Sequence, residues 1–438
     1  MTAACPDRSL PLMSALSGFL RELKKPAHLL VAISGGSDST GLLVGLSSLR
    51  SCLPDIRLSA TTIDHALRPE AADEARAVAK LCADLGIFHV TRRWETEKPV
   101  SGISAAAREA RYSLLSDVAD EIGATAIVTG HTLGDQIETV TMRSGRGEAN
   151  NGSQPFSLGL SGMAPATLLN ARHWILRPLL HTSRNDIRAF LTHHGFGWID
   201  DPSNLDRHYE RVRVRETLIA REAAFDADAI ADAGQVRMQL AQDAADWLAA
   251  HATIEHAVLA RISVTGLSGE PAVIRHALST LAAVLGGRPY MLSRENGDRL
   301  MTFIASGTLG RMTAGRVIFD SRSEALYMLR ENRNLPHLTV GVGEGAIWDS
   351  RFRIENHSAQ PMEVTVQQNE AVVFESAPGS LARLAVRVSP HVANQPAVSV
   401  SVTPYLAPFD RFLPAFDLPI ASRIAGLMGR NPYLLPPV

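Results

Sequence analysis

The chain has 438 residues, of which 45% are hydrophobic and 20% are charged, and its formal net charge is -2. This length predicts two or three domains, and the composition is that of a globular protein with a sizeable buried core. A net charge this close to zero excludes a global basic field as the means of holding a nucleic acid.

The three cysteines, Cys5, Cys52 and Cys82, are widely spaced and form no CxxC pair. This spacing excludes a disulfide framework and a cysteine-rich zinc module, and it favours a reducing compartment. No apolar run reaches the roughly 18 residues that a membrane-spanning helix needs. The N-terminus also lacks the basic start and unbroken apolar stretch of a signal peptide. We therefore expect a cytoplasmic protein without a membrane partner.

From residue 28 to about 200, short apolar runs alternate with helical stretches. The predicted strands are His28–Ile33, Ile56–Ile63, Ile87–Val90, Ala124–Thr129 and Trp174–Leu176. The predicted helices are 37–50, 69–85, 103–122, 133–143 and 184–194. Buried strands separated by helices of this length indicate βαβ units, and hence an α/β fold whose parallel sheet is covered by helices. Ligands of such sheets bind at the carboxyl ends of the strands.

The alternation stops after Asp200. Residues from about 206 to 305 have a helical pattern, with amphipathic stretches at 217–250 and 271–285. From about 307 the pattern becomes β-like, and the strands expected there are Leu309–Phe319, Ala325–Leu329, Leu384–Val388 and Ala397–Val402. We predict three domains: an α/β domain at 1–218, a mainly helical domain at 219–330 and a small β-rich α+β domain at 331–438.

The first predicted strand runs directly into Ser34-Gly35-Gly36-Ser37-Asp38-Ser39, and a helix follows. Glycines let backbone N–H groups close around an anion, and a helix N-terminus adds favourable partial charge. Asp38 repels phosphates unless it holds Mg²⁺ or a cationic group. The alternative is a Gly-Gly turn capped by serine. No GxxxxGK[ST] or GxGxxG sequence is present to indicate a Walker-type or dinucleotide site.

Polar residues also follow the second predicted strand, in the sequence Asp64-His65-Ala66-Leu67-Arg68. This sequence places an acid, an imidazole and a guanidinium at the ligand edge of the sheet. We predict that Asp64 and His65 contact a nucleotide there. The structural alternative is that Asp64 only caps the following helix.

A third polar cluster follows the predicted strand Ala124–Thr129. His131 ends the strand, and Asp135 and Glu138 lie at i and i+3 on one face of the next helix. Two carboxylates this close repel each other unless a metal ion or an amine joins them. The alternative is an acidic first turn that the helix dipole favours.

Arginines recur near these clusters. Arg108 and Arg111 lie one turn apart at the border of a buried helix face, and Arg211 begins an R-x-R-x-R run after Asp201-Pro202-Ser203-Asn204. Such side chains are usually solvated or paired on a helix surface. Beside a nucleotide, they would instead contact phosphate, a developing negative charge or a polyanion.

The segment Ser34–Ser39 resembles the SGGxDS loop of the PP-loop ATPases, which have an adenine nucleotide alpha hydrolase-like fold. That resemblance implies that the loop binds the pyrophosphate of ATP while a substrate oxygen attacks the α-phosphate. Pyrophosphate leaves first, and AMP leaves in the second step.

The motifs SGGxDS, DHxLR, AARxxRY, HxxxDQxET, RPLL (Arg177–Leu180), DPSN and R-x-R-x-R occur in this order from 28 to about 215. The series resembles the tRNA(Ile)-lysidine synthetase family. The resemblance implies a ligase that joins lysine to C2 of the wobble cytidine in the CAU anticodon of tRNA(Ile). ATP first adenylates the C2 oxygen, and the amine of lysine then displaces AMP. The modified tRNA reads AUA as isoleucine.

The resemblance also implies roles for single residues. Ser34–Ser39, Asp64 and His65 would bind ATP, and Asp38 would be linked to Mg²⁺. Three residues would serve the adenylation step: Asp38, Arg111 and His131.

For the second step, the resemblance implies that Asp135, Glu138 and Arg211 bind lysine. Residues 219–438 occupy the place of the tRNA-contacting domains of the family, and a homodimer is compatible with the sequence. The chain departs from the family at Gly134, where an Asp is usual, and at Val212, where Asn is common. Its 145–161 loop is also longer than usual.

Three alternative functions stay open. A sulfur-inserting tRNA enzyme of this fold needs paired cysteines, which this chain lacks. An amidotransferase-type synthetase needs a glutaminase domain or an ammonia source, and Cys5 is not placed as an N-terminal nucleophile. A tRNA-binding protein without catalysis would not require the whole set of polar site residues, namely Asp38, Arg111, His131, Asp135 and Glu138.

Overall fold

The computed structural model describes residues 10–50, 53–143, 158–200, 227–367, 373–392 and 399–438. The chain divides into two compact units, of which the first is Met1–Val236 with Leu435–Val438 and the second is Arg237–Leu434. The boundary predicted near 218 lies outside the described residues, and the three-domain division stays a prediction. No helix of the described ranges is long and apolar enough to cross a membrane.

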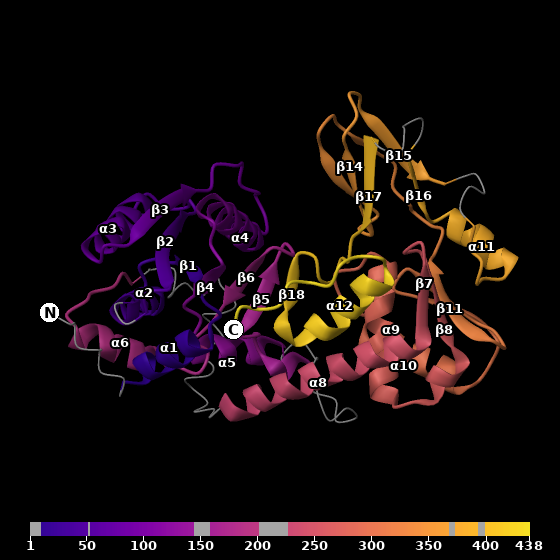
Figure 1. Ribbon diagram of the computed structural model, residues 1–438, viewed down its shortest axis with the longest axis horizontal. Helices are drawn as coiled ribbons and strands as arrows, with labels where there is room; N and C mark the ends of the chain where they lie inside the picture. Colours follow the sequence, from indigo (N-terminus) through magenta and orange to yellow (C-terminus); the bar gives the residue numbers. More distant parts are fainter. Residues whose placement is uncertain (1–9, 51–52, 144–157, 201–226, 368–372, 393–398) are drawn as a thin grey trace. The chain divides into compact units, whose positions relative to one another are not determined.

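The first unit contains the predicted alternation of strands and helices (Figure 1). Its elements are α1 (Pro11–Glu22), β1 (Ala27–Ala32), α2 (Ser37–Arg50), β2 (Ile56–Asp64), α3 (Ala71–Asp84), β3 (Phe88–Arg93), α4 (Ile103–Ile122), β4 (Ala126–Thr129), α5 (Leu133–Arg143), β5 (Ala166–Leu169), β6 (His173–Leu176) and α6 (Arg184–His193). Helix α8 (Ala227–His251) begins in this unit and continues into the second.

The strands of this unit lie in the order β5-β6-β4-β1-β2-β3. All neighbours from β6 to β3 are parallel, so the predicted parallel sheet is confirmed. Right-handed crossovers put α2 and α3 on one face of it and α4 on the other. Strand β1 is central and all its residues are buried, which matches its unbroken apolar sequence. The loop after β1 therefore opens at the middle of the ligand edge.

Strand β5 was not predicted, and it pairs antiparallel with β6. The two are joined through Asn170 and Ala171, whose φ angles are 51° and 55°. Positive φ at both central positions is typical of a tight hairpin turn, which usually carries Asn-Gly. Alanine at the second position hides this signal in the sequence.

The second unit is built from helices and antiparallel sheets. After α8 its elements are β7 (Ala252–Glu255), β8 (Leu259–Ser263), α9 (Pro271–Leu285), α10 (Arg294–Ala305), β9 (Gly310–Ala314), β10 (Val317–Ser321), β11 (Ala325–Arg330), β12 (Leu338–Val340), β13 (Gly345–Trp348), β14 (Phe352–Asn356), β15 (Met362–Val366), α11 (Gly379–Val386), β16 (Pro390–Val392), β17 (Val400–Pro404), β18 (Phe412–Pro414) and α12 (Leu418–Leu427).

One sheet of this unit has the order β7-β8-β11-β10-β9, and two smaller sheets have the orders β12-β15-β16 and β13-β14-β17. The strand predicted at Ala325–Leu329 is confirmed as β11, and it forms the expected hairpin with β10. The run predicted as one strand at Leu309–Phe319 is two antiparallel strands, β9 and β10, because the chain turns at Gly315 and Arg316, which have positive φ. Strands β7 and β8 correct the helical pattern expected up to residue 305. Each strand is too short for the alternation of apolar and polar residues to be recognised between α8 and α9.

The strand predicted at Leu384–Val388 is wrong, because most of it belongs to α11. Leu381 and Ala385 are buried one helical turn apart and pack in the core of this unit. A short apolar run does not distinguish a buried strand from a buried helical turn. The strand predicted at Ala397–Val402 is found, in its described part, as the beginning of β17.

Candidate active site

The predicted phosphate loop joins β1 to α2 in a tight turn. Gly35 has a φ of 87°, and a Cβ atom there would lie 2.7 Å from Cδ1 of Ile199. The amide of Ile199 donates a 2.9 Å hydrogen bond to the carbonyl of Gly35. Within the loop, the amide of Ser34 donates to Oγ of Ser39, which donates to the carbonyl of Gly36. Glycine is therefore required at position 35, and the loop closes over the N-terminus of α2.

The end of β4 lies against this loop. A Cβ atom on Gly130 would lie 2.9 Å from the backbone C and O atoms of Asp38, so only glycine permits the approach. The next residue, His131, is thereby held close to the loop. Nδ1 of His131 and Oγ1 of Thr129 are 2.9 Å apart, and their hydrogen bond orients the ring.

Asp38 forms an ion pair that the sequence analysis did not predict. Nε of Arg184 donates to both carboxylate oxygens of Asp38 at 3.1 and 3.0 Å, and Nη2 donates to Oδ2 at 2.7 Å. Arg184 is the first residue of α6, which follows β6 at the ligand edge. The cationic group that Asp38 needs beside phosphates is thus a side chain of this unit.

Asp135 and Glu138 lie on α5, near the same guanidinium. The pKa of Arg184 lies above its usual value, chiefly because it donates hydrogen bonds to Asp38. The charges of Asp38, Asp135 and Glu138 raise it further. Asp38 on α2 therefore holds the guanidinium of Arg184 directly, whereas Asp135 and Glu138 on α5 act on it through their charges. We call Asp38, Asp135 and Glu138 the acidic cluster.

The two carboxylates on α5 have different local environments. The amide and the hydroxyl of Thr132 donate to Oδ2 of Asp135 at 2.9 and 3.1 Å, so Asp135 also caps the first turn of α5. The structural alternative for Asp135 is thus present in the structure and does not exclude a ligand. Glu138 is buried, with 4% of its surface exposed. A Cβ at Gly134 would meet only Oγ1 of Thr132, at 3.6 Å, so packing does not require glycine there.

Asp64 and His65 follow β2 at the same edge of the sheet. Oδ1 of Asp64 accepts a 2.7 Å hydrogen bond from the amide of Ala66, so Asp64 fixes this turn and does not cap α3. Burial lowers the pKa of His65, and the charge of Arg111 lowers it further. The imidazole is therefore neutral at pH 7, and its buried Nδ1 atom has no hydrogen-bond partner among the residues that the structure describes. Such an atom suits a contact with a nucleotide.

Arg111 belongs to a basic cluster around Tyr112 on α4. The guanidinium of Arg108 lies 5.0 Å from the centre of the Tyr112 ring. Burial raises the pKa of the Tyr112 hydroxyl, but Arg108, Arg111 and Arg177 together bring it below its usual value. Nη1 of Arg177 donates to the carbonyl of Ala164 and to Thr167, at 2.8 and 2.9 Å. Arg177, the residue after β6, therefore supports the cluster beside the end of the β5–β6 pair.

The chain is similar to known proteins over nearly its whole length. The PP-loop domain family matches residues 11–222. A tRNA(Ile)-lysidine synthase of Rhizobium meliloti (strain 1021) is 40% identical, and the alignment covers 98% of this chain and 97% of that protein. This chain belongs to the tRNA(Ile)-lysidine synthase family. The synthase of Mesorhizobium japonicum is 37% identical, and the alignment covers 93% of this chain and 93% of that protein. The synthase of Bartonella tribocorum is 31% identical, and the alignment covers 78% of this chain and 80% of that protein.

Membership of the tRNA(Ile)-lysidine synthase family confirms the predicted resemblance, the fold class, the ligase activity and the use of ATP. The roles of single residues stay predictions, although the structure brings most of them to one edge of the sheet. Arg211 and the DPSN motif lie outside the described residues. Of the long 145–161 loop, only the short turn Leu158–Ser161 is described.

The side chains at this edge fit a nucleotide better than a metal ion. The described part of the chain contains no group of three or more His, Cys, Asp and Glu residues that could hold a metal ion. Both carboxylate oxygens of Asp38 are engaged by Arg184, so the side chains as placed do not form a Mg²⁺ site. They do fit ATP, because the N-terminus of α2 presents backbone N–H groups to an anion and His65 offers a ring nitrogen.

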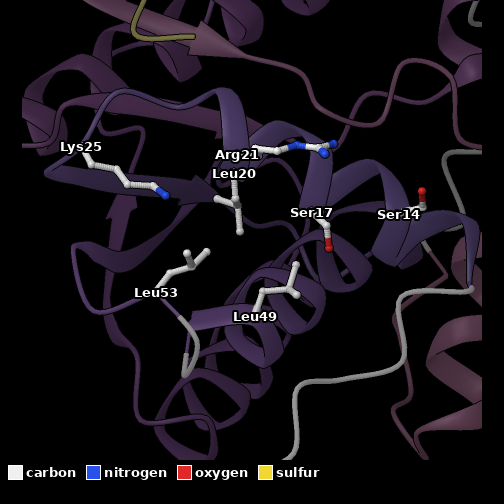
Figure 2. A pocket seen from close by; sticks show the side chains of 8 residues that line it. Ser14, Ser17, Leu20, Arg21, Lys25, Leu49 and Leu53 are labelled. Carbon is white, nitrogen blue, oxygen red and sulfur yellow. The ribbon is translucent and has the colours of Figure 1, made fainter.

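A cavity of about 410 Å³ lies elsewhere in the first unit, between α1 and the end of α2 (Figure 2). Its lining includes Ser17, Arg21, Lys25 and Leu49. None of its lining residues is among the predicted site residues. The candidate site is the polar edge of the sheet and not this cavity.

Proposed function

We propose that this protein ligates L-lysine to C2 of the wobble cytidine in the CAU anticodon of tRNA(Ile). The reaction consumes ATP, passes through an adenylated cytidine, releases pyrophosphate and AMP, and takes place in the cytoplasm. The observation that carries the proposal is the position of the acidic cluster beside the glycine turn of the phosphate loop. A homodimer and a Mg²⁺ ion that enters with ATP stay predictions.

The first step needs a site for a triphosphate and for charge that develops on its α-phosphate. The turn at Gly35 and the N-terminus of α2 direct backbone N–H groups at the β- and γ-phosphates. Arg111 comes from the basic cluster of α4, where it stabilises negative charge on the α-phosphate as the C2 oxygen attacks. His65 remains neutral at pH 7, and its Nδ1 atom can hydrogen-bond to the nucleotide. His131, just after β4, serves the same adenylation step.

The second step needs a site for an amine. Asp135 and Glu138 attract an ammonium group of lysine, and the burial of Glu138 strengthens this attraction by excluding water. The amine nitrogen then forms a bond to C2 of the cytidine, and the bond from C2 to the adenylated oxygen breaks. AMP leaves with that oxygen. Before the nitrogen attacks, the ammonium gives one proton to a carboxylate of the pair Asp135 and Glu138.

The test uses purified protein with ATP, Mg²⁺, lysine and a tRNA(Ile) transcript that carries the CAU anticodon. Mass spectrometry of the digested nucleosides is expected to show lysidine in place of the wobble cytidine. A transcript with uridine at the wobble position is the matched control and is expected to stay unmodified.

An unmodified cytidine, in a reaction where the folded protein binds ATP, would refute the proposal. A mass increase that corresponds to sulfur would instead support the sulfur-inserting alternative. Leaving out lysine is expected to stop the reaction after pyrophosphate release, which separates the two steps.

A further inference from the structure

Arg184, the first residue of α6, is the guanidinium partner of the phosphate loop. It hydrogen-bonds to Asp38, the carboxylate of the phosphate loop, and it lies in the electrostatic field of Asp135 and Glu138. The four groups together carry three negative charges and one positive charge. The position of this one guanidinium decides which carboxylate is neutralised.

The helix to which Arg184 belongs does not need it. The amide of Asp186 donates to Oγ of Ser183 at 3.1 Å, and that hydroxyl donates to Oδ2 of Asp186 at 2.6 Å, which caps α6. A cation in the first turn of a helix is disfavoured by the helix dipole. The side chain of Arg184 is also only 34% exposed. An unfavourable local position with a bidentate partner on another helix indicates a role at that partner.

We propose that Arg184 is a positioning residue that divides the acidic cluster into a neutralised half and a charged half. By holding both oxygens of Asp38, it removes a negative charge beside the phosphate loop. Asp38 in turn keeps the guanidinium away from Asp135 and Glu138, which stay charged for the ammonium of lysine. This inference rests on the proposed function, since it takes ATP and lysine as the two ligands.

The proposal predicts opposite effects for the two partners of the pair. Without Arg184, the bare carboxylate of Asp38 repels the triphosphate, while the attraction for lysine is kept or strengthened. Without the charge of Asp38, the guanidinium is free to pair with Asp135 and Glu138 and competes with lysine. Removing both charges leaves a neutral pair again.

The experiment is calorimetric titration of the full chain without tRNA, first with a non-hydrolysable ATP analogue and then with lysine in the presence of that analogue. We expect Arg184→Gln to raise the Kd of the ATP analogue about tenfold and to leave the Kd of lysine unchanged or lower. We expect Asp38→Asn to raise the Kd of lysine about tenfold. In the double variant, both Kd values are expected to return to within about threefold of wild type.

The matched control is Arg172→Gln, which removes a guanidinium from an exposed ion pair with Asp120 in the same unit. It is expected to leave both Kd values unchanged. Arg184→Lys keeps the charge without the bidentate geometry, so it is expected to bind the ATP analogue better than Arg184→Gln. The melting temperature of each variant identifies loss of folding.

A double variant that stays impaired for either ligand would overturn the inference, because Arg184 would then contact that ligand directly. Single variants that both weaken the same ligand, or a wild-type protein that binds no lysine, would overturn it too. The proposed function fails by a different result, namely that the wild-type protein binds both ligands and leaves the tRNA unmodified.

Discussion

Each unit contains a carboxylate that is held by arginine. In the first unit, Asp38 is held by Arg184 beside the phosphate loop. In the second, Asp349 in the turn between β13 and β14 is held by three arginines, namely Arg316, Arg330 and Arg351. Nε of Arg330 lies 3.1 Å from its carboxylate and Nε of Arg351 lies 2.7 Å from it. The chemistry is the same, but the surroundings differ.

Burial separates the two sites. The side chains of Asp349 and Arg330 are each 1% exposed, whereas those of Asp38 and Arg184 are 17% and 34% exposed. Burial lowers the pKa of Arg351 to about 10 even though Asp349 lies beside it, while the pKa of Arg184 is raised. A buried cluster of charges must stay intact, because each charge left alone is costly to desolvate. The partly exposed pair of Asp38 and Arg184, at the ligand edge of the sheet, can instead break when one of its members binds a ligand.

The largest effect is expected from Asp349→Asn, which leaves three arginines without their carboxylate in the core of the second unit. Because unpaired buried charges are strongly destabilising, the free energy of unfolding should fall by about 3–5 kcal/mol. Urea denaturation measures it. Asp38→Asn is the matched control and should cost about 1 kcal/mol or less, since its pair is partly solvated. Equal losses in the two variants would contradict the comparison.

The second largest effect is expected on the rate of adenylation, in the variant Asp38→Ala. Asp38→Ala should leave ATP binding intact but remove a group that serves the adenylation step and fixes Arg184 beside the loop, so adenylation should slow by a factor of about a thousand, or about 4 kcal/mol. Pyrophosphate release in the absence of lysine measures this step. The melting temperature should stay close to that of wild type. A variant that adenylates at the normal rate would show that Asp38 is only a structural residue.

His276 on α9 gives the second unit a dependence on pH. Burial lowers its pKa to about 4. Below pH 6.5 the unfolded chain takes up a proton that the folded protein refuses until about pH 4. Stability should therefore fall as the pH drops through this window, by about 3 kcal/mol in total. Denaturation at pH 7, 5 and 4 measures the loss, and His276→Leu should reduce it. An unchanged pH profile in that variant would refute the assignment.

The sequence predicts what depends on neighbours along the chain. The unbroken apolar run of β1 and the glycines after it are enough to predict the central strand and the phosphate loop, because both follow from local chemistry. The i, i+3 spacing of Asp135 and Glu138 likewise places them on one helix face. Strand β5 is hidden because its turn carries Ala171, which rarely adopts a positive φ.

The ion pairs could not be predicted, because they depend on distant contacts. Arg184 is 146 positions from Asp38 and meets it only once α6 packs on α2. The one local signal is a cation in the first turn of a helix, where the dipole disfavours it. The arginines around Asp349 give no such signal, because burial alone distinguishes them from the many other arginines of the chain.

The smallest effect is expected at Asp135, which has two roles that a pair of variants can separate. Asp135→Ala removes the charge that attracts lysine and the acceptor for Thr132. The KM for lysine should rise about tenfold, and loss of the cap should cost about 1 kcal/mol of stability. Adenylation without lysine should proceed at the normal rate.

Asp135→Asn separates the two roles, because its amide oxygen can still accept a hydrogen bond from Thr132 but carries no charge. If Asp135 binds lysine, the Asn variant should keep the stability of wild type and still show the raised KM for lysine. Steady-state kinetics and thermal melting measure the two quantities on the same samples. If the Asn variant uses lysine normally while the Ala variant does not, Asp135 is a helix cap, and Glu138 is left as the carboxylate that attracts the amine.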